Sequence, residues 1–220
     1  MKSTPTTINT TSTLSKRPYD YIKRGIDILL SSLAILLLSP IYIIVAIWIV
    51  MDDGLPILFR QKRAGYLNKP FSIYKFRTMK IQQSNPATYY WEGGVPDDFV
   101  FKQATDNSHQ ANFTGIGAFL RKWSLDELPQ FFNVLLGNMS LVGPRPELTE
   151  IANCYNQEQF KRLRVKPGVT GWAQVNGRSN INHGEKIKLD LDYVEHYGLW
   201  MDIKILFLTV LKVLFKQGAV

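Results

Sequence analysis

Residues 28–51 read ILLSSLAILLLSPIYIIVAIWIVM and contain no charged side chain. As an unbroken helix this run would reach about 36 Å, which is enough to cross the hydrocarbon core of a bilayer. Pro40 lies near its middle, has no N–H for the carbonyl of Leu36, and crowds that turn of helix. The hydroxyl of Ser39 can donate a hydrogen bond to the carbonyl of Ile35 or Leu36 instead. The run therefore predicts a membrane helix that is broken at Ser39-Pro40.

Both flanks of this run are cationic. Four Lys and Arg residues precede it between positions 16 and 24, and seven follow it between positions 60 and 80. Lys and Arg favour the cytoplasmic side of a membrane, so a helix that bends at the break and returns to the same face suits both flanks. A kinked single span is the alternative, because bilayer helices tolerate proline. We expect the re-entrant form over residues 19–51.

Asp27 lies at the edge of the apolar run, an unusual place for a carboxylate. Lys23 and Arg24 stand four and three residues before it, which is the spacing of neighbours on a helix surface. We expect a structural ion pair between Asp27 and one of these two cations.

The length and charge of the chain limit its organisation and its partners. Its 220 residues leave room for one globular domain beside the membrane element. We expect a disordered Ser/Thr/Asn-rich tail at 1–18 and a cytosolic, membrane-associated domain at 52–220. A net charge of +8 suits anionic lipids, phosphorylated substrates or nucleic acid. The membrane run favours the first two, so we expect no nucleic-acid partner.

The pattern of the remaining residues predicts an α+β fold that is mainly helical, with short strands and interfacial amphipathic helices. A hairpin is expected within 52–80, followed by a long loop over 82–115. Apolar spacing predicts helices near 128–136, over 148–164, from Glu185 to Tyr197, and over 199–215. The Gly-punctuated stretch 166–178 predicts a compact loop and hairpin.

Asp126 and Glu127 form the most informative acidic pair. Adjacent carboxylates at a helix start can bind a divalent cation, and a carboxylate can attack phosphorus. Ser124 to Glu127 also fits a capping box, in which Glu127 only bonds back to the main chain of Ser124. With Ser124 as the cap, Pro129 would fall inside the helix, where its missing N–H would leave a carbonyl without a donor. With Asp126 as the N-cap, Pro129 falls in the first turn, where the N–H groups have no helical partner in any case. The spacing alone leaves catalysis and capping open.

Arg145 stands between two prolines in the stretch GPRPE, which holds it in an extended, rigid loop. Such a guanidinium suits bidentate binding of phosphate. A turn-stabilising salt bridge to Glu147 or Glu150 explains it equally well.

The chain has no Walker A motif, no G-x-G-x-x-G and no G-x-S-x-G, so a P-loop, Rossmann or serine-hydrolase mechanism is unsupported. Its three histidines lack metal-ligand spacing.

Several stretches taken together resemble the bacterial sugar transferase family, the monotopic polyprenyl-phosphate phosphoglycosyl transferases. The likeness extends over about residues 20–216 and resembles the minimal catalytic form, since larger relatives carry extra N-terminal transmembrane helices. It rests on KRGIDI (23–28), the Ser39-Pro40 break, FRQKRAG (59–65), KPFSIYKFRTM (69–79), RKWSLDELPQFFNVLLGNMSLVGPRPE (121–147), KPGVTGWAQVNGR (166–178) and DLDYVEHYGLWMDIKIL (190–206).

The resemblance implies a catalytic domain on the cytoplasmic face of the bacterial inner membrane. It implies transfer of a sugar-1-phosphate from a UDP-sugar to undecaprenyl phosphate, with release of UMP, as the first membrane step of surface glycan biosynthesis. Mg²⁺ is the implied cofactor. Asp126 would be the nucleophile that forms a phosphosugar-aspartyl intermediate, and Asp126 and Glu127 would support the metal.

An anionic carboxylate that attacks an anionic diphosphate needs cations around the phosphoryl oxygens. Arg145, Arg121, Arg77 and Arg178 are the candidate phosphate-binding residues. Anionic lipids of the inner membrane are expected partners, and the sequence leaves a homo-oligomer open. The alternative is a membrane-anchored binding or scaffold protein whose acidic pair is only a helix cap.

Overall fold

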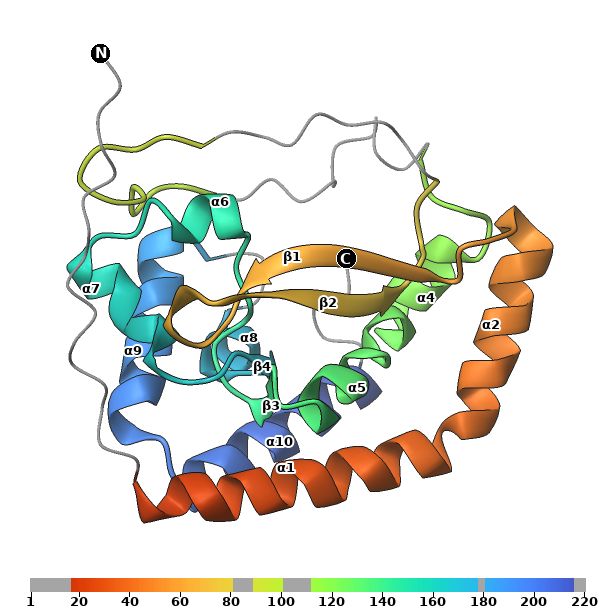
Figure 1. Cartoon of the computed structure of the whole chain (residues 1–220), viewed down its shortest axis with the longest axis horizontal. Coiled ribbons are helices and arrows are strands. Elements are labelled where there is room, and N and C mark those ends of the chain that lie inside the picture. The colour runs from red at the N-terminus through yellow and green to blue at the C-terminus, as the bar shows by residue number, and fades with distance from the viewer. Residues whose placement is uncertain (1–16, 81–88, 101–111, 178–180, 216–220) are drawn as a thin grey trace.

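The computed structural model describes residues 17–80, 89–100, 112–177 and 181–215. In these ranges the chain is mainly helical and contains two sheets of two strands each, which confirms the expected class (Figure 1). The tail expected at 1–18 lies outside the described residues except for its last two positions. Residues 82–88 and 101–111 of the loop expected at 82–115 lie outside them as well.

The apolar run forms two helices, α1 (Pro18–Leu37) and α2 (Ser39–Asp53), which meet at Leu38 and are bent by 59°. The hydroxyl of Ser39 donates to the carbonyl of Leu36 at 2.8 Å, the acceptor that Pro40 leaves without its helical donor. The break at Ser39-Pro40 is therefore confirmed. No single described helix is long and apolar enough to cross a membrane, although this bent pair passes that test when its two parts are taken together.

Helix α2 rises from the end of α1 along one side of the domain (Figure 1). Its Val45 and Ile49 are buried in a cluster with Phe76, Ile116 and Leu120. The outer sides of α1 and α2, and of α10 (Leu199–Leu214), instead expose many large apolar side chains, an amount that is unusual for a surface facing water. They include Leu29, Leu33, Leu36, Leu37, Ile43, Ile44, Ile47, Met51, Trp200, Ile203, Phe207, Val210 and Leu214.

Asp27 has other hydrogen-bond partners than the cations expected from its spacing. Its Oδ1 accepts from the hydroxyl of Ser140 at 3.1 Å and from the main-chain N–H of Leu141 at 2.9 Å. Lys23 instead bonds to an acid on α10, and Arg24 donates to two carbonyls of the helix that ends at Leu135. Asp27 is 3% exposed, because it faces the domain rather than its own helix surface. It thus fastens α1 to the strand that starts at Ser140.

The expected hairpin is confirmed. Strand β1 (Leu58–Ala64) pairs antiparallel with β2 (Pro70–Phe76), in a register that places Leu58 opposite Phe76 and Ala64 opposite Pro70. The short 3₁₀ turn η1 (Tyr66–Asn68) connects them. This hairpin lies across the middle of the molecule, above α5 (Gln130–Leu135) in the view of Figure 1.

The stretch 166–178 does not form a hairpin. Strand β4 (Gly168–Thr170) pairs in parallel with β3 (Ser140–Val142), and α8 (Trp172–Asn176) follows directly. A Cβ added to Gly168 would lie 2.1 Å from the main-chain nitrogen of Gly143, so this close crossing requires glycine. The glycines therefore mark a contact between distant strands rather than a local turn.

The other elements follow in short pieces. The helix expected over 148–164 is interrupted: α6 (Thr149–Ala152) is followed, after a break, by α7 (Gln157–Phe160), which continues directly into the 3₁₀ turn η3 (Lys161–Arg164). The predicted helix near 185–197 is α9 (His183–His196), and the one over 199–215 is α10. The main core lies between β2, α5, β3, α9 and α10, and contains Phe71, Ile73, Val134, Met139, Leu141, Val142, Val175, Tyr193, Tyr197 and Ile205.

Candidate active site

Asp126 and Glu127 lie in a tight break between two short helices. Helix α4 (Gly117–Lys122) ends before Ser124, which adopts a left-handed conformation with φ of 54°. One 3₁₀ turn, η2 (Leu125–Glu127), then carries both carboxylates, and Pro129 precedes α5. Ser124 makes no capping hydrogen bond with its side chain, so the capping-box interpretation is wrong. The missing N–H of Pro129 falls at the start of α5, where no helical donor is needed.

Two cations meet at Glu127. Its Oε1 accepts from the ammonium of Lys75 at 2.7 Å and from the guanidinium of Arg145 at 3.0 Å. The same ammonium lies 4.0 Å from Oδ2 of Asp126. Strand β2, the 3₁₀ turn and the loop after β3 therefore converge on one cluster of two acids and two cations. The salt bridge expected between Arg145 and Glu147 or Glu150 is replaced by this pair with Glu127.

The two adjacent carboxyl groups have opposite pKa shifts. Burial, and secondly the neighbouring charge of Glu127, together raise the pKa of Asp126 to about 6, although the charges of Lys75, Arg121 and Arg145 act to lower it. Burial also opposes ionisation of Glu127, but the charges and hydrogen bonds of Lys75 and Arg145 outweigh it and hold the pKa of Glu127 well below its usual range. Near neutral pH both groups are therefore ionised, with Asp126 the more basic of the two.

Sequence reasoning missed Lys75 and the residue that positions it. Asn133, which is fully buried on α5, accepts from the main-chain N–H of Tyr74 at 2.9 Å and donates to the carbonyl of Ser72 at 2.8 Å. These two bonds fix β2 to α5 on the side where Lys75 reaches Glu127. In the sequence Lys75 stands between Tyr74 and Phe76 without a sign of its partner, and only the hairpin directs it to the acidic pair.

The four predicted phosphate-binding arginines have different surroundings. Arg145 has a side chain that is 39% exposed, so it reaches both Glu127 and the surface. Arg121 lies at the end of α4 with its guanidinium over the ring of Phe113, and its charge lowers the pKa of Asp126. Arg178 lies outside the described residues.

Arg77 is 4% exposed and is engaged at the end of α2. Its NH2 donates to the carbonyls of Asp53 and Gly54, each at 2.7 Å, and its NH1 lies 3.2 Å from a carboxylate oxygen of Asp53. In this structure Arg77 therefore connects the end of α2 to the end of β2.

Comparison with known proteins identifies the family. A model of the family described as "Bacterial sugar transferase" matches residues 18–216. The chain belongs to this family. This sugar transferase is 42% identical over 199 residues to the UDP-glucose:undecaprenyl-phosphate glucose-1-phosphate transferase of Escherichia coli K12, an alignment that covers 87% of the chain and 40% of that relative. It therefore spans less than half of that protein's length.

Two further relatives of the sugar transferase differ in length. It is 40% identical over 198 residues to the uncharacterized sugar transferase EpsL of Bacillus subtilis, covering 90% of the chain and 89% of EpsL. It is 37% identical over 208 residues to the UDP-N-acetylgalactosamine-undecaprenyl-phosphate N-acetylgalactosaminephosphotransferase of Aeromonas hydrophila, covering 91% of the chain and 45% of the relative. These two relatives are thus named for different donors, UDP-glucose and UDP-N-acetylgalactosamine.

The acidic pair of the transferase has the donor chemistry that Mg²⁺ prefers. Mg²⁺ in phosphate-transferring sites is held by one or two carboxylates together with the substrate's phosphates and water. Asp126 and Glu127 supply such oxygens beside two cations that suit phosphate. Among the described residues there is no group of three or more His, Cys, Asp and Glu that would hold a metal without the substrate. The residues present therefore fit a metal that is shared with a diphosphate.

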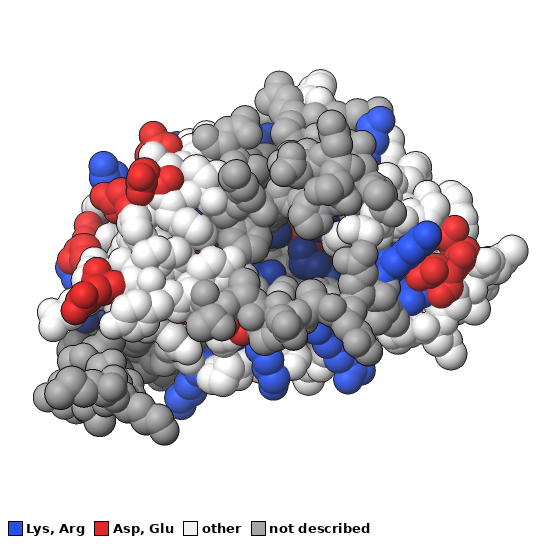
Figure 2. Space-filling model, turned by 90° about the horizontal axis from the view of Figure 1, so that it is seen from above, with Lys and Arg blue, Asp and Glu red and all other residues white. Residues whose placement is uncertain are grey.

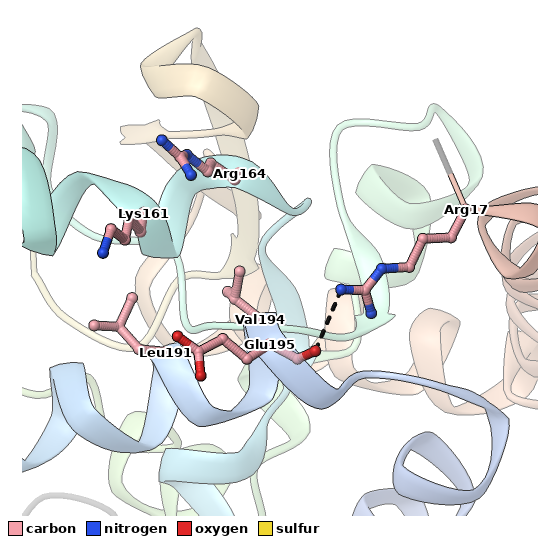
Figure 3. A pocket seen from close by; sticks show the side chains of 6 residues that line it. All are labelled: Arg17, Lys161, Arg164, Leu191, Val194 and Glu195. Atoms are coloured by element: carbon pink, nitrogen blue, oxygen red, sulfur yellow. Dashed lines mark hydrogen bonds between the residues drawn. The ribbon is translucent and has the colours of Figure 1, made fainter. Parts of the chain in front are cut away.

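A pocket elsewhere in the transferase is distinct from this site. Arg17, Lys161, Arg164, Leu191, Val194 and Glu195 line it, between η3, α9 and the start of α1 (Figure 3). Arg17 closes one side by donating to the carbonyl of Glu195 at 3.2 Å. None of the acidic pair, Lys75 or Arg145 lines this pocket, so we place the chemistry at the cluster around Glu127.

Seen from above, Lys and Arg atoms are visible in a hollow near the middle of the molecule (Figure 2).

Proposed function

We propose that this sugar transferase moves a sugar-1-phosphate from a UDP-sugar to undecaprenyl phosphate, releasing UMP. The cluster of Asp126, Glu127, Lys75 and Arg145 is the observation that carries the proposal. In this cluster Asp126, a carboxyl group with a raised pKa, lies beside two cations. Relatives of the chain are named as transferases that act on undecaprenyl phosphate and a UDP-sugar, which supports the same function.

Asp126 is the proposed nucleophile. An oxygen of its carboxylate attacks the phosphorus that is bonded to the sugar, and the bond from this phosphorus to the bridging oxygen breaks, so that UMP leaves with that oxygen. The phosphate oxygen of the lipid then attacks the same phosphorus and displaces the carboxylate. No proton has to be transferred in either step. The higher pKa of Asp126 makes it a better nucleophile than Glu127.

Lys75 and Arg145 oppose the repulsion between the carboxylate and the diphosphate. Arg145 reaches the surface from a rigid loop, so its guanidinium can hold phosphoryl oxygens while Lys75 stays between the two acids. Asp126 and Glu127 are the residues that would hold Mg²⁺, which when bound supplies further charge neutralisation on the diphosphate.

The proposed location is the cytoplasmic face of the bacterial inner membrane, with α1 and α2 as a re-entrant pair. The exposed apolar sides of α1, α2 and α10 support contact with acyl chains, and the cations after α2 support contact with anionic headgroups. The short helices beside the acidic pair also expose Phe119, Trp123 and Leu136. This arrangement supports an active site at the depth of a lipid phosphate.

The purified protein incubated with undecaprenyl phosphate, Mg²⁺ and a panel of UDP-sugars tests the activity through release of UMP. We expect UMP with at least one donor and none with Asp126→Asn. Absence of UMP with every donor would favour the alternative of a membrane-anchored scaffold.

The covalent step is tested without the lipid acceptor. With a donor labelled in the sugar, we expect one burst of UMP that does not exceed one equivalent per enzyme, with the label bound to the protein. A UMP burst that appears only after undecaprenyl phosphate is added would support direct transfer and overturn the aspartyl intermediate.

A further inference from the structure

The loop that presents Arg145 has a donor for each of four consecutive carbonyls. The carbonyl of Pro144 accepts from the N–H of Gly168 at 2.9 Å, and that of Glu147 accepts from the N–H of Ala64 at 2.9 Å. The two carbonyls between them accept from arginine side chains. Because Pro144 and Pro146 also have fixed φ angles, the loop has little freedom to move Arg145.

The donor to the carbonyl of Arg145 is Arg162, whose NH2 lies 3.0 Å away. Arg63 donates to the next carbonyl, that of Pro146, at 3.4 Å. The side chain of Arg162 is completely buried, and its NH2 also donates to Asp190 at 2.5 Å. Its NH1 donates to the hydroxyl of Tyr155 at 2.6 Å. Arg162 therefore connects α9 and η3 to the main chain of the loop.

A buried arginine is a costly way to stabilise a fold. Burying an ion pair loses hydration that the mutual attraction of the charges barely repays, and apolar replacements of such pairs are often as stable. The planar guanidinium does offer directed donors to several groups at once, which an apolar residue does not. Here one of those donors is used on the main chain of a proposed phosphate-binding residue. The buried position of Arg162 is thus better explained by a role in placing the loop of Arg145 than by a contribution to the stability of the fold.

We propose that Arg162 is a positioning residue for the transfer reaction, which acts by holding the main chain of Arg145 so that its guanidinium meets Glu127 and the donor phosphates. The inference rests on the proposed function. Asp190 orients Arg162 from α9, and Arg145 is the group that touches the substrate. A displacement of about 1 Å at a reacting group can cost about 100-fold in rate, so a remote donor of this kind has a measurable effect.

Arg162→Lys and Tyr155→Phe form a matched pair of variants. Lysine keeps the charge beside Asp190, but its ammonium ends one bond short of the NH2 position and loses the carbonyl of Arg145. Tyr155→Phe removes a bond of the same guanidinium that does not involve the loop. We expect kcat/KM for the UDP-sugar to fall by about 10- to 100-fold in Arg162→Lys and by less than about twofold in Tyr155→Phe. Asp190→Asn serves as a second variant that weakens the orientation of Arg162.

A double-mutant cycle with Arg145→Met separates positioning from general damage. If Arg162 acts through Arg145, Arg162→Lys adds less than about twofold to the loss in Arg145→Met, whereas independent effects multiply. Multiplying losses, or wild-type kinetics in both Arg162→Lys and Asp190→Asn, would overturn the inference and leave the proposed function intact.

Amide hydrogen exchange of Gly143, Arg145, Glu147 and Leu148, the positions of this loop that carry an amide hydrogen, gives a readout that needs no activity. We expect faster exchange in Arg162→Lys than in Tyr155→Phe at equal melting temperature. Equal exchange in the two variants would overturn the positioning role. Failure of the wild-type protein to release UMP would count against the proposed function, and the exchange result would still decide the placement of the loop.

Discussion

The ammonium of Lys75 lies 2.7 Å from Oε1 of Glu127, and through this pair the two adjacent acids acquire different properties. Glu127 shares its oxygen with Arg145 and stays ionised far below neutral pH. Asp126 lies 4.0 Å from the same ammonium, is 6% exposed, and has a raised pKa. Glu127 is thus ion-paired with Lys75 and Arg145, whereas Asp126 is buried and its ionisation lowers the stability of the fold.

This difference predicts opposite stability effects for two matched substitutions. The pKa of Asp126 is raised from its ordinary 3.8 to about 6 in the folded chain, so folding free energy is lost as the pH rises through this interval, and the full cost is present above about pH 6. Asp126→Asn removes this cost and should raise the free energy of unfolding at pH 8 by up to about 3 kcal/mol. Glu127→Gln deprives Lys75 and Arg145 of their partner and should lower it by about 1–3 kcal/mol.

Thermal melts of both variants at pH 8 and pH 5 check the prediction. The gain of Asp126→Asn should shrink at pH 5, where Asp126 in the wild type is protonated. A melting temperature of Asp126→Asn that is equal to or below the wild type at pH 8 would contradict a strained, buried charge at this position.

The pH dependence of kcat/KM should show an acidic limb with an apparent pKa of about 6, because the nucleophile must be ionised in the free enzyme. Activity should fall about tenfold per pH unit below that value. Lys75 lowers the pKa of Asp126 more than Arg121 does. Lys75→Met should therefore move the limb to higher pH, and Arg121→Met should move it in the same direction by less. A limb that stays in place in Lys75→Met would show that another group titrates.

Local patterns in the sequence were sufficient for elements that local physics decides. The Ser39-Pro40 break follows from a missing donor and a nearby hydroxyl, and the structure has both. The hairpin over β1 and β2 follows from short apolar stretches between turn residues. The acidic pair was singled out from its position before an apolar helix.

Contacts between distant residues could not be predicted in this way. Asp27 has two cations at helical spacing, yet it bonds to Leu141, which is more than a hundred positions away. Glu127 fits a local cap, yet two cations from other elements take its oxygen. In both cases a nearby residue in the sequence was a plausible hydrogen-bond partner, but the carboxyl group is buried against another element and bonds to that element instead. Lys75 was missed for the same reason, since its role depends on the hairpin register.

The contact of Asp27 with β3 predicts that α1 contributes to the stability of the domain. Asp27→Ala leaves the buried N–H of Leu141 and the hydroxyl of Ser140 without their acceptor, which should cost about 1–3 kcal/mol for each group. Ser140→Ala removes only the second of these bonds and should cost about 1 kcal/mol. Urea unfolding in detergent measures both. Equal losses in the two variants would contradict a bond between Asp27 and the main chain of Leu141.

The break in the apolar run 28–51 predicts a direct effect on the proposed active site. Just after the break, the hydroxyl of Tyr42 donates at 2.6 Å to the carbonyl of Leu128, the residue that follows Glu127. Tyr42→Phe keeps the ring contacts with Phe76 and Phe132 and removes only this bond. We expect a loss of about 1 kcal/mol in stability and a fall in kcat, because the turn with Asp126 becomes less fixed. Trp48→Phe, on the exposed side of α2, is the control and should leave kcat unchanged.

Pro40→Ala extends this prediction to the bend itself. Alanine restores an N–H for the carbonyl of Leu36, so α1 and α2 can join into a straighter helix and withdraw Tyr42 from Leu128. Tyr42→Phe should then cause no further loss of kcat when added to Pro40→Ala. Cysteines placed at residues 10 and 80 of Cys154→Ala protein measure the topology by labelling in intact cells. We expect both to lie on one side with Pro40 present. Suppose that in Pro40→Ala the two cysteines lie on opposite sides of the membrane, and that Tyr42→Phe still lowers kcat by its full amount. The bend would then not act on the active site through Tyr42, and the prediction would be contradicted.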